Sequence, residues 1–142
     1  MTWKLCCAVL AMTVLLAVPS TALADRTLEV DPHHLNFGKQ PFNTFTKKSF
    51  TITNVSSQPI AISVDAGFVP DDFSPGQPES TCPWFEPTTL APGQSCTHVV
   101  GYYADPAPPF LGQRRIELNV VARDGSGQVL ASRTVIVTAR GV

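Results

Sequence analysis

Beyond residue 24 this sequence lacks three features that would place it among membrane, helical or nucleic-acid-binding proteins. It has no apolar run of the roughly 20 residues that a spanning helix needs, and no amphipathic helical period of useful length. Charged residues make up only 15% of the chain, with ten basic side chains against eleven acidic ones. Lys47-Lys48 and Arg114-Arg115 are isolated basic pairs, which we interpret as solvated strand ends rather than a nucleic-acid-binding patch.

The first 24 residues have the three parts of a secretory signal peptide. Lys4 supplies the positive charge, residues 5–18 form an apolar run, and Ala22-Leu23-Ala24 fits the small-x-small cleavage rule. Because the run is too short to span a membrane as a helix, we predict cleavage after Ala24. The mature chain is then a single domain, residues 25–142, with no stable membrane span and a periplasmic or secreted location.

Cysteine is scarce in the predicted mature chain. The whole sequence has four cysteines, and only Cys82 and Cys96 lie beyond the signal peptide. In an exported chain we expect these two to form a disulfide bond. Closing a loop of this length stabilises a domain by roughly 3 kcal/mol in the chain-entropy model. The alternative is a cysteine-based metal site, but the sequence has no CxxC spacing and no nearby pair of histidines to support it.

Apolar and polar residues alternate along most of the mature chain, which is the period of a β-strand with one buried face. Seven such segments lie near 27–30, 33–37, 48–54, 59–64, 97–103, 114–122 and 128–139. Residues 65–95 interrupt them with a long stretch rich in Pro, Gly, Asp and Ser. The pattern predicts an all-β fold: a single immunoglobulin-like antiparallel β-sandwich of about seven strands with one disulfide.

Three short motifs occur in an informative order. Leu35-Asn36-Phe37-Gly38 follows the first predicted strand, Phe50-Thr51-Ile52-Thr53-Asn54 ends a later one, and Leu90-Ala91-Pro92-Gly93-Gln94-Ser95-Cys96 closes the cysteine loop. Together they resemble ASH-type (ASPM- and Hydin-like) domains, whose bacterial relatives are called choice-of-anchor D domains. The resemblance covers most of residues 27–141. It implies an immunoglobulin-like fold and a binding or scaffolding role, and it transfers no active site.

Each motif also has a physical interpretation. Gly38 and Gly93 are expected at turns with positive φ, which glycine adopts without a Cβ clash. Pro92-Gly93 predicts a type II turn. Asn54 is expected to bond backbone groups of the turn that follows it, although Asn54-Val55-Ser56 also matches an N-glycosylation sequon.

Candidate catalytic and metal-binding residues are sparse. His33, His34 and His98 lack metal-ligand spacing, and we interpret all three as surface residues. Asp71-Asp72 is interpreted as part of a solvated loop, since no further regularly spaced acidic ligands accompany it. No signature of a nucleophile with its base is present. We therefore predict a protein that is not an enzyme and has no cofactor or metal, with a small hydrolase or metalloenzyme as an alternative.

Aromatic residues gather in the irregular stretch. Trp84 and Phe85 lie inside the cysteine loop, and Phe73 lies upstream. They either cap the sandwich core beside the disulfide or form an exposed anchor for a partner. We predict an exported, non-catalytic binding or scaffolding module for another envelope or extracellular protein, contacted through Trp84, Phe85 and Phe73 or through an open sheet edge. The alternatives are a periplasmic pilus-type chaperone or assembly factor and a carbohydrate-binding module.

Overall fold

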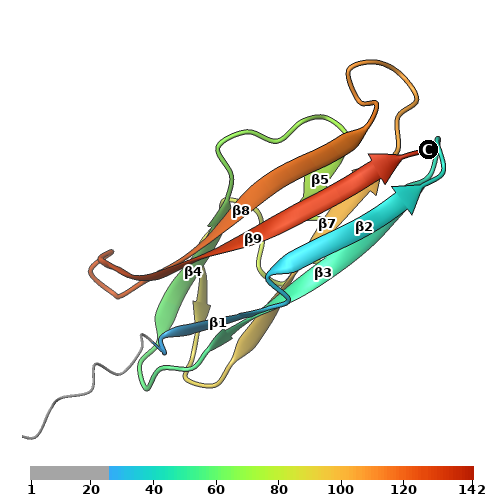
Figure 1. The fold of residues 1–142 in the computed structure, drawn as a ribbon. Helices are drawn as coiled ribbons and strands as arrows, with labels where there is room; N and C mark the ends of the chain where they lie inside the picture. Colours follow the sequence, from blue (N-terminus) through green and yellow to red (C-terminus); the bar gives the residue numbers. More distant parts are fainter. Residues whose placement is uncertain (1–25) are drawn as a thin grey trace, which may run out of the picture.

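The computed structural model describes residues 26–142, which form two β-sheets packed face to face (Figure 1). The four-stranded sheet has the order β1-β3-β7-β5, and the five-stranded sheet has the order β2-β9-β8-β4-β6. The strands are β1 (Leu28–Asp31), β2 (His34–Gln40), β3 (Phe45–Asn54), β4 (Ile60–Asp65), β5 (Phe73–Pro75), β6 (Thr88–Leu90), β7 (Ser95–Tyr103), β8 (Gln113–Arg123) and β9 (Val129–Gly141). The predicted immunoglobulin-like sandwich is confirmed. The predicted signal peptide lies outside the described residues.

The hydrophobic core lies between the two sheets and follows the two-residue alternation. On β4, Ile60, Ile62 and Val64 are buried, while the residues between them are partly exposed. On β8, Leu118 and Val120 are fully buried. Since successive side chains of a strand point to opposite faces, one face of each sheet packs inward and the other is in contact with solvent. Residues 26–142 contain no helix of the length and hydropathy that a membrane crossing requires.

One strand pairing differs from a purely antiparallel sandwich. After β1 pairs with β3 in the four-stranded sheet, the chain crosses to the other sheet, where β2 runs parallel to β9. The other pairings between the strands are antiparallel. Alternation cannot reveal this difference, because the side-chain period is the same in both arrangements.

Two of the nine strands lie inside the stretch that the sequence marks as irregular. β5 pairs with β7, and β6 pairs with β4, each through three residues. Strands this short carry too few residues for an alternating pattern, and β5 ends in a proline. Segments 73–75 and 88–90 therefore extend the edges of the two sheets, and the chain between them forms a loop.

The predicted positive φ of both glycines is confirmed, at 67° for Gly38 and 76° for Gly93. Gly93 lies in the predicted turn, but Gly38 lies within β2 at a register shift rather than at a turn. The Gln94 N–H donates to the Ala91 carbonyl at 2.9 Å, which closes the type II turn that Pro92-Gly93 predicts.

Asn54 organises the turn between β3 and β4 from a fully buried position. Its Oδ1 accepts the Ser56 N–H at 2.9 Å, and its Nδ2 donates to the carbonyls of Gln58 at 2.7 Å and Leu90 at 3.0 Å. The side chain therefore joins this turn to the end of β6. In the folded domain the Nδ2 amide group of the sequon asparagine is therefore engaged in hydrogen bonds within the protein.

Candidate functional site

The disulfide Cys82–Cys96 ties the segment before β6 to the first residues of β7. Both half-cystines are buried, and their Cα atoms lie 5.4 Å apart. The N–H groups of Thr81 and Cys82 both donate to the Thr97 carbonyl, at 2.8 Å and 3.1 Å. The predicted disulfide is confirmed, and it holds this end of the loop against the four-stranded sheet.

His98 on β7 holds a second point of the same loop. The Gly76 N–H donates to His98 Nε2 at 3.1 Å, so Nε2 carries no proton. Nδ1 therefore bears the proton and donates to the Cys82 carbonyl at 2.8 Å. The ring is fully buried, so interpreting His98 as a surface residue was wrong. His33 and His34 are exposed, and residues 26–142 contain no group of three or more His, Cys, Asp or Glu side chains arranged to hold a metal ion.

The Trp84 side chain is half-buried and packs against His98. Its ring centroid lies 5.8 Å from that of His98, and its backbone forms a bridge with Val64 on β4. Gly76 has φ of 70°, and a Cβ at this position would overlap Trp84 Cβ. Glycine is therefore required for the close approach of the two segments. Trp84 caps the core beside the disulfide, as one of the two sequence interpretations expects.

Phe85 has the opposite placement. Its side chain is 62% exposed, although its N–H donates to the Val64 carbonyl at 3.2 Å. Its φ of 65° is in the left-handed region, which a bulky residue adopts only when surrounding contacts impose it. The ring lies 4.4 Å from that of Trp84. A strained backbone, supported from beneath by Trp84, thus presents an apolar ring to solvent.

The third predicted contact residue, Phe73, is a correction. It is the first residue of β5, only 4% exposed, and its ring lies 5.1 Å from that of Tyr102 in the core. Phe73 therefore cannot serve as an exposed anchor in this fold. The exposed aromatic of the upstream segment is Phe68, at 78% exposure; the sequence alone could not distinguish the two because this segment has no alternating pattern.

Asp72 and Arg114 correct two further interpretations. The Asp72 side chain is fully buried, and Arg114 Nε donates to its Oδ2 at 2.8 Å. Arg114 Nη2 lies 3.4 Å from Oδ1, and its guanidinium stacks 5.5 Å from the Phe110 ring. Neither residue is a solvated loop or strand-end charge. The pair joins the segment before β5 to β8, and thus one sheet to the other.

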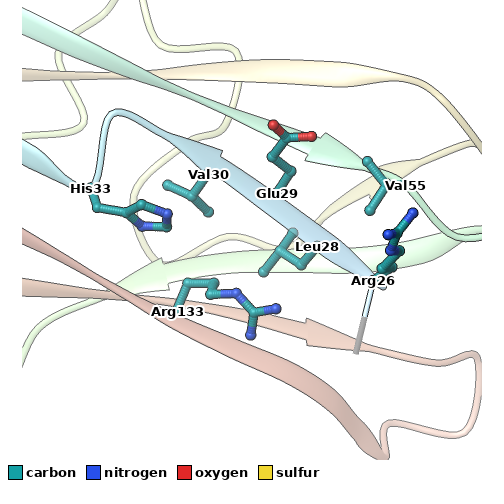
Figure 2. Close-up of a pocket in the computed structure, with 7 residues that line it drawn as sticks. All are labelled: Arg26, Leu28, Glu29, Val30, His33, Val55 and Arg133. Carbon is teal, nitrogen blue, oxygen red and sulfur yellow. The ribbon is translucent and has the colours of Figure 1, made fainter. Parts of the chain in front are cut away.

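A hollow of about 350 Å³ opens beside β1 (Figure 2). Its lining includes Leu28 and Val30 from β1 and Arg133 from β9. Leu28 and Val30 are already buried, at 3% and 2% exposure, and Val55 is the exposed apolar side chain of the lining, at 41%. Phe85 is larger and more exposed, so the Trp84–Phe85 loop is the better candidate for a contact site.

Stability should depend on pH through His98. Burial, opposed by the hydrogen bond to the Cys82 carbonyl, lowers the pKa of His98 from its ordinary value of about 6.5. As the pH drops below about 6.5, the unfolded chain takes up a proton that the folded protein does not, so the free energy of unfolding falls. The loss continues down to the lowered pKa and amounts to at most about 1.4 kcal/mol per pH unit.

Denaturant unfolding between about pH 7.5 and pH 5 measures this slope. His98→Gln retains one donor and one acceptor and should flatten it. If His98→Gln keeps the slope of the original protein, His98 is not the titrating group.

The fold defines the class of this chain: residues 26–142 form an immunoglobulin-like β-sandwich. No protein-family model and no curated protein matches the sequence. Among solved structures, the ASH/PapD-like domain of human CEP192 (PapD-like domain 7) matches with a TM-score of 0.64 and 8% identity, over 93% of this chain and 97% of that chain. At this identity the similarity establishes the fold alone.

Two further solved structures, of a chaperone and of a glycoside hydrolase, also match this fold. The periplasmic chaperone SfaE matches with a TM-score of 0.53 and 11% identity, over 80% of this chain and 57% of the chaperone. A family 123 glycoside hydrolase from Clostridium perfringens matches with a TM-score of 0.55 and 8% identity, over 78% of this chain but only 23% of the hydrolase. The ASH-type resemblance seen in the sequence is thus confirmed at the level of fold.

Proposed function

We propose that residues 25–142 form an exported, non-catalytic domain that binds another protein of the cell envelope or extracellular space. The observation that carries this proposal is the presentation of Phe85. The protein holds an exposed, apolar side chain on a strained backbone, and a disulfide, a buried histidine and a packed tryptophan support it. Backbone strain and exposed aromatic surface concentrate at binding sites.

Export is supported by two independent features. The N-terminal sequence has the pattern of a cleaved signal peptide, and a disulfide bond persists in oxidising compartments. The similarity to a periplasmic chaperone is compatible with this location.

The residues that suggested chemistry are used structurally. His98 has both ring nitrogens bonded to backbone groups, and the Asp72 carboxylate is paired with Arg114. Neither is oriented toward an open cleft beside a nucleophile, as acid–base or nucleophilic catalysis requires. This arrangement supports a binding role over a hydrolytic one.

The pilus-type chaperone alternative receives less support from the strand order. A strand that donates an edge to a client must have that edge unpaired. The last strand, β9, lies between β2 and β8 and is paired on both sides. This pairing argues against donation by β9, and the exposed ring of Phe85 leads us to favour a partner contact at the Trp84–Phe85 loop.

Phe85→Ala tests the proposal directly. We expect it to weaken partner binding about tenfold or more, as the loss of an aromatic hot spot does, with a stability change within about 0.5 kcal/mol. Partners cross-linked to the protein in envelope extracts are identified, purified and titrated against each variant. Trp84→Ala is less suitable, because Trp84 also packs on His98.

Val129→Ala is the matched control, since Val129 is a similarly exposed apolar residue, at 53%, remote in sequence from the loop. It should leave partner affinity unchanged. Equal affinity of the Phe85→Ala and Val129→Ala variants would remove the loop from the proposed interface. Binding of oligosaccharides, but of no protein, would favour the carbohydrate-binding alternative instead.

A further inference from the structure

A second surface, remote from Phe85 in the sequence, lies on the outer face of β2, β9 and β8. It is a shallow hollow of about 610 Å³, and its lining contains Lys39, Arg115, Arg140 and two histidines but no Asp or Glu. We call Lys39, Arg115 and Arg140, with the polar Asn36 and Thr138 between them, the cationic face. Acidic residues outnumber basic ones beyond the signal peptide, so this gathering of cations is a local segregation of charge.

A β-bulge in β2 places Lys39 on the cationic face. Asn36 is opposite Thr138 and Lys39 is opposite Arg140, so three steps along β2 match two steps along β9. Gly38, with φ of 67°, takes the extra position. Leu35 and Phe37 point inward and are buried, and simple alternation would turn Lys39 inward as well. The bulge returns Lys39 to the solvent side, beside Arg140.

The charges of this face are little neutralised. Within residues 26–142, no acidic side chain lies at ion-pair distance from Lys39 or Arg140. Arg115 pairs with Glu117 at 2.6 Å, but both side chains are more than half exposed, and such a pair exchanges readily with another anion. The face therefore presents positive charge that an acidic partner would complement.

The adjoining strand β2 is an edge strand, with no further strand paired to its outer side within residues 26–142, although its Gly38 N–H is bonded to Asn36 Oδ1 at 2.8 Å. The two sheets end in β1, β5, β2 and β6. β5 and β6 have three residues each, and β1 carries the exposed acidic residues Glu29 and Asp31. β2, with seven residues and no acidic side chain, is the longest of these edges. A lysine on an edge strand discourages neutral or basic strands and favours an acidic one.

We infer that the cationic face and the β2 edge bind an extended, acidic segment of a protein partner. Lys39 and Arg140 form one row across the sheet, and Arg115, opposite Thr138, belongs to the next row. Neighbouring rows are about 6.6 Å apart, which is also the distance between alternate residues of an extended chain. Alternate residues of a segment beside β2 would face Lys39 in one row and Asn36 in the next, with Arg140 one strand further in along the first row and Arg115 two strands further in along the second. This inference is independent of the role proposed for Phe85.

A fluorescent peptide that alternates glutamate and threonine over roughly eight residues is the probe. We expect it to bind the full domain saturably, to weaken as salt is raised from about 0.05 M to about 0.5 M, and to shift the amide resonances of Asn36, Arg115 and Thr138. Lys39→Gln combined with Arg140→Gln should weaken binding at least about fivefold.

Lys47→Gln combined with Lys48→Gln is the matched control, because it removes the same charge from β3 in the other sheet. It should change the affinity less than about twofold, and a peptide with glutamine in place of glutamate should not bind. Equal weakening by the two double variants, equal binding of the glutamine peptide, or binding of a sulfated oligosaccharide without the glutamate peptide would each overturn the inference. Loss of the Phe85 partner leaves this test unaffected.

Discussion

Arg114→Ala is expected to lower the free energy of unfolding by about 3 kcal/mol, because removing one partner of a buried ion pair leaves the other charge uncompensated. The Asp72 carboxylate is fully buried and accepts hydrogen bonds from Arg114 at 2.8 Å and 3.4 Å. Without the guanidinium it must lose its charge or draw in water. The damage should be greatest at the end of the sandwich where this pair joins β8 to the segment before β5.

Arg115→Ala is the control that the chain itself supplies. Arg115 is the next residue on the same strand and also forms an ion pair, but both partners are exposed. Its loss should cost less than about 1 kcal/mol. Equilibrium denaturation of both variants compares the two pairs, and equal losses would show that burial of Asp72 contributes nothing. Replacing Asp72 and Arg114 together by leucine should recover part of the stability, because no charge is then left unpaired.

Removing the disulfide with Cys82→Ala and Cys96→Ala should cost a comparable amount, about 3 kcal/mol for two cysteines 14 positions apart. Without the crosslink the unfolded chain has more conformations, so folding must restrict it further. The loop that carries Trp84 and Phe85 also loses one of its attachments to β7. Binding through Phe85 should therefore weaken together with stability.

Reduction provides the control for this variant. A thiol reductant should lower the midpoint of denaturant unfolding of the original protein toward that of the double variant, and it should leave the double variant unchanged. A double variant as stable as the original protein would show that hydrogen bonds to Thr97 and His98 hold the loop without the crosslink.

The strands and turns of this domain were predictable because their causes are local. A strand such as β8 reveals itself through alternation of apolar and polar residues over its whole length. The turn at Pro92-Gly93 follows from the backbone preferences of two adjacent residues. β5 and β6 were missed because three residues are too few to show a period, and both strands depend on the neighbours with which they pair.

The candidate site was predictable only in part. The sequence marks Trp84-Phe85 within the cysteine loop, but it cannot assign one ring to the core and the other to solvent. That assignment depends on the approach of Gly76 and His98 from other segments. Phe73 was misplaced for the same reason, since its burial results from its contact with Tyr102 on β7.

The sequence by itself determined the all-β class, the disulfide and the turns, because alternation, cysteine number and the conformational limits of glycine and proline act over a few residues. Only the tertiary structure decided which charges and rings are exposed. The ion pair of Asp72 with Arg114 spans 42 positions, and the Gly38 bulge that turns Lys39 outward is defined by pairing with β9. Burial and charge at these positions depend on segments far apart in the sequence that meet only in the folded sandwich.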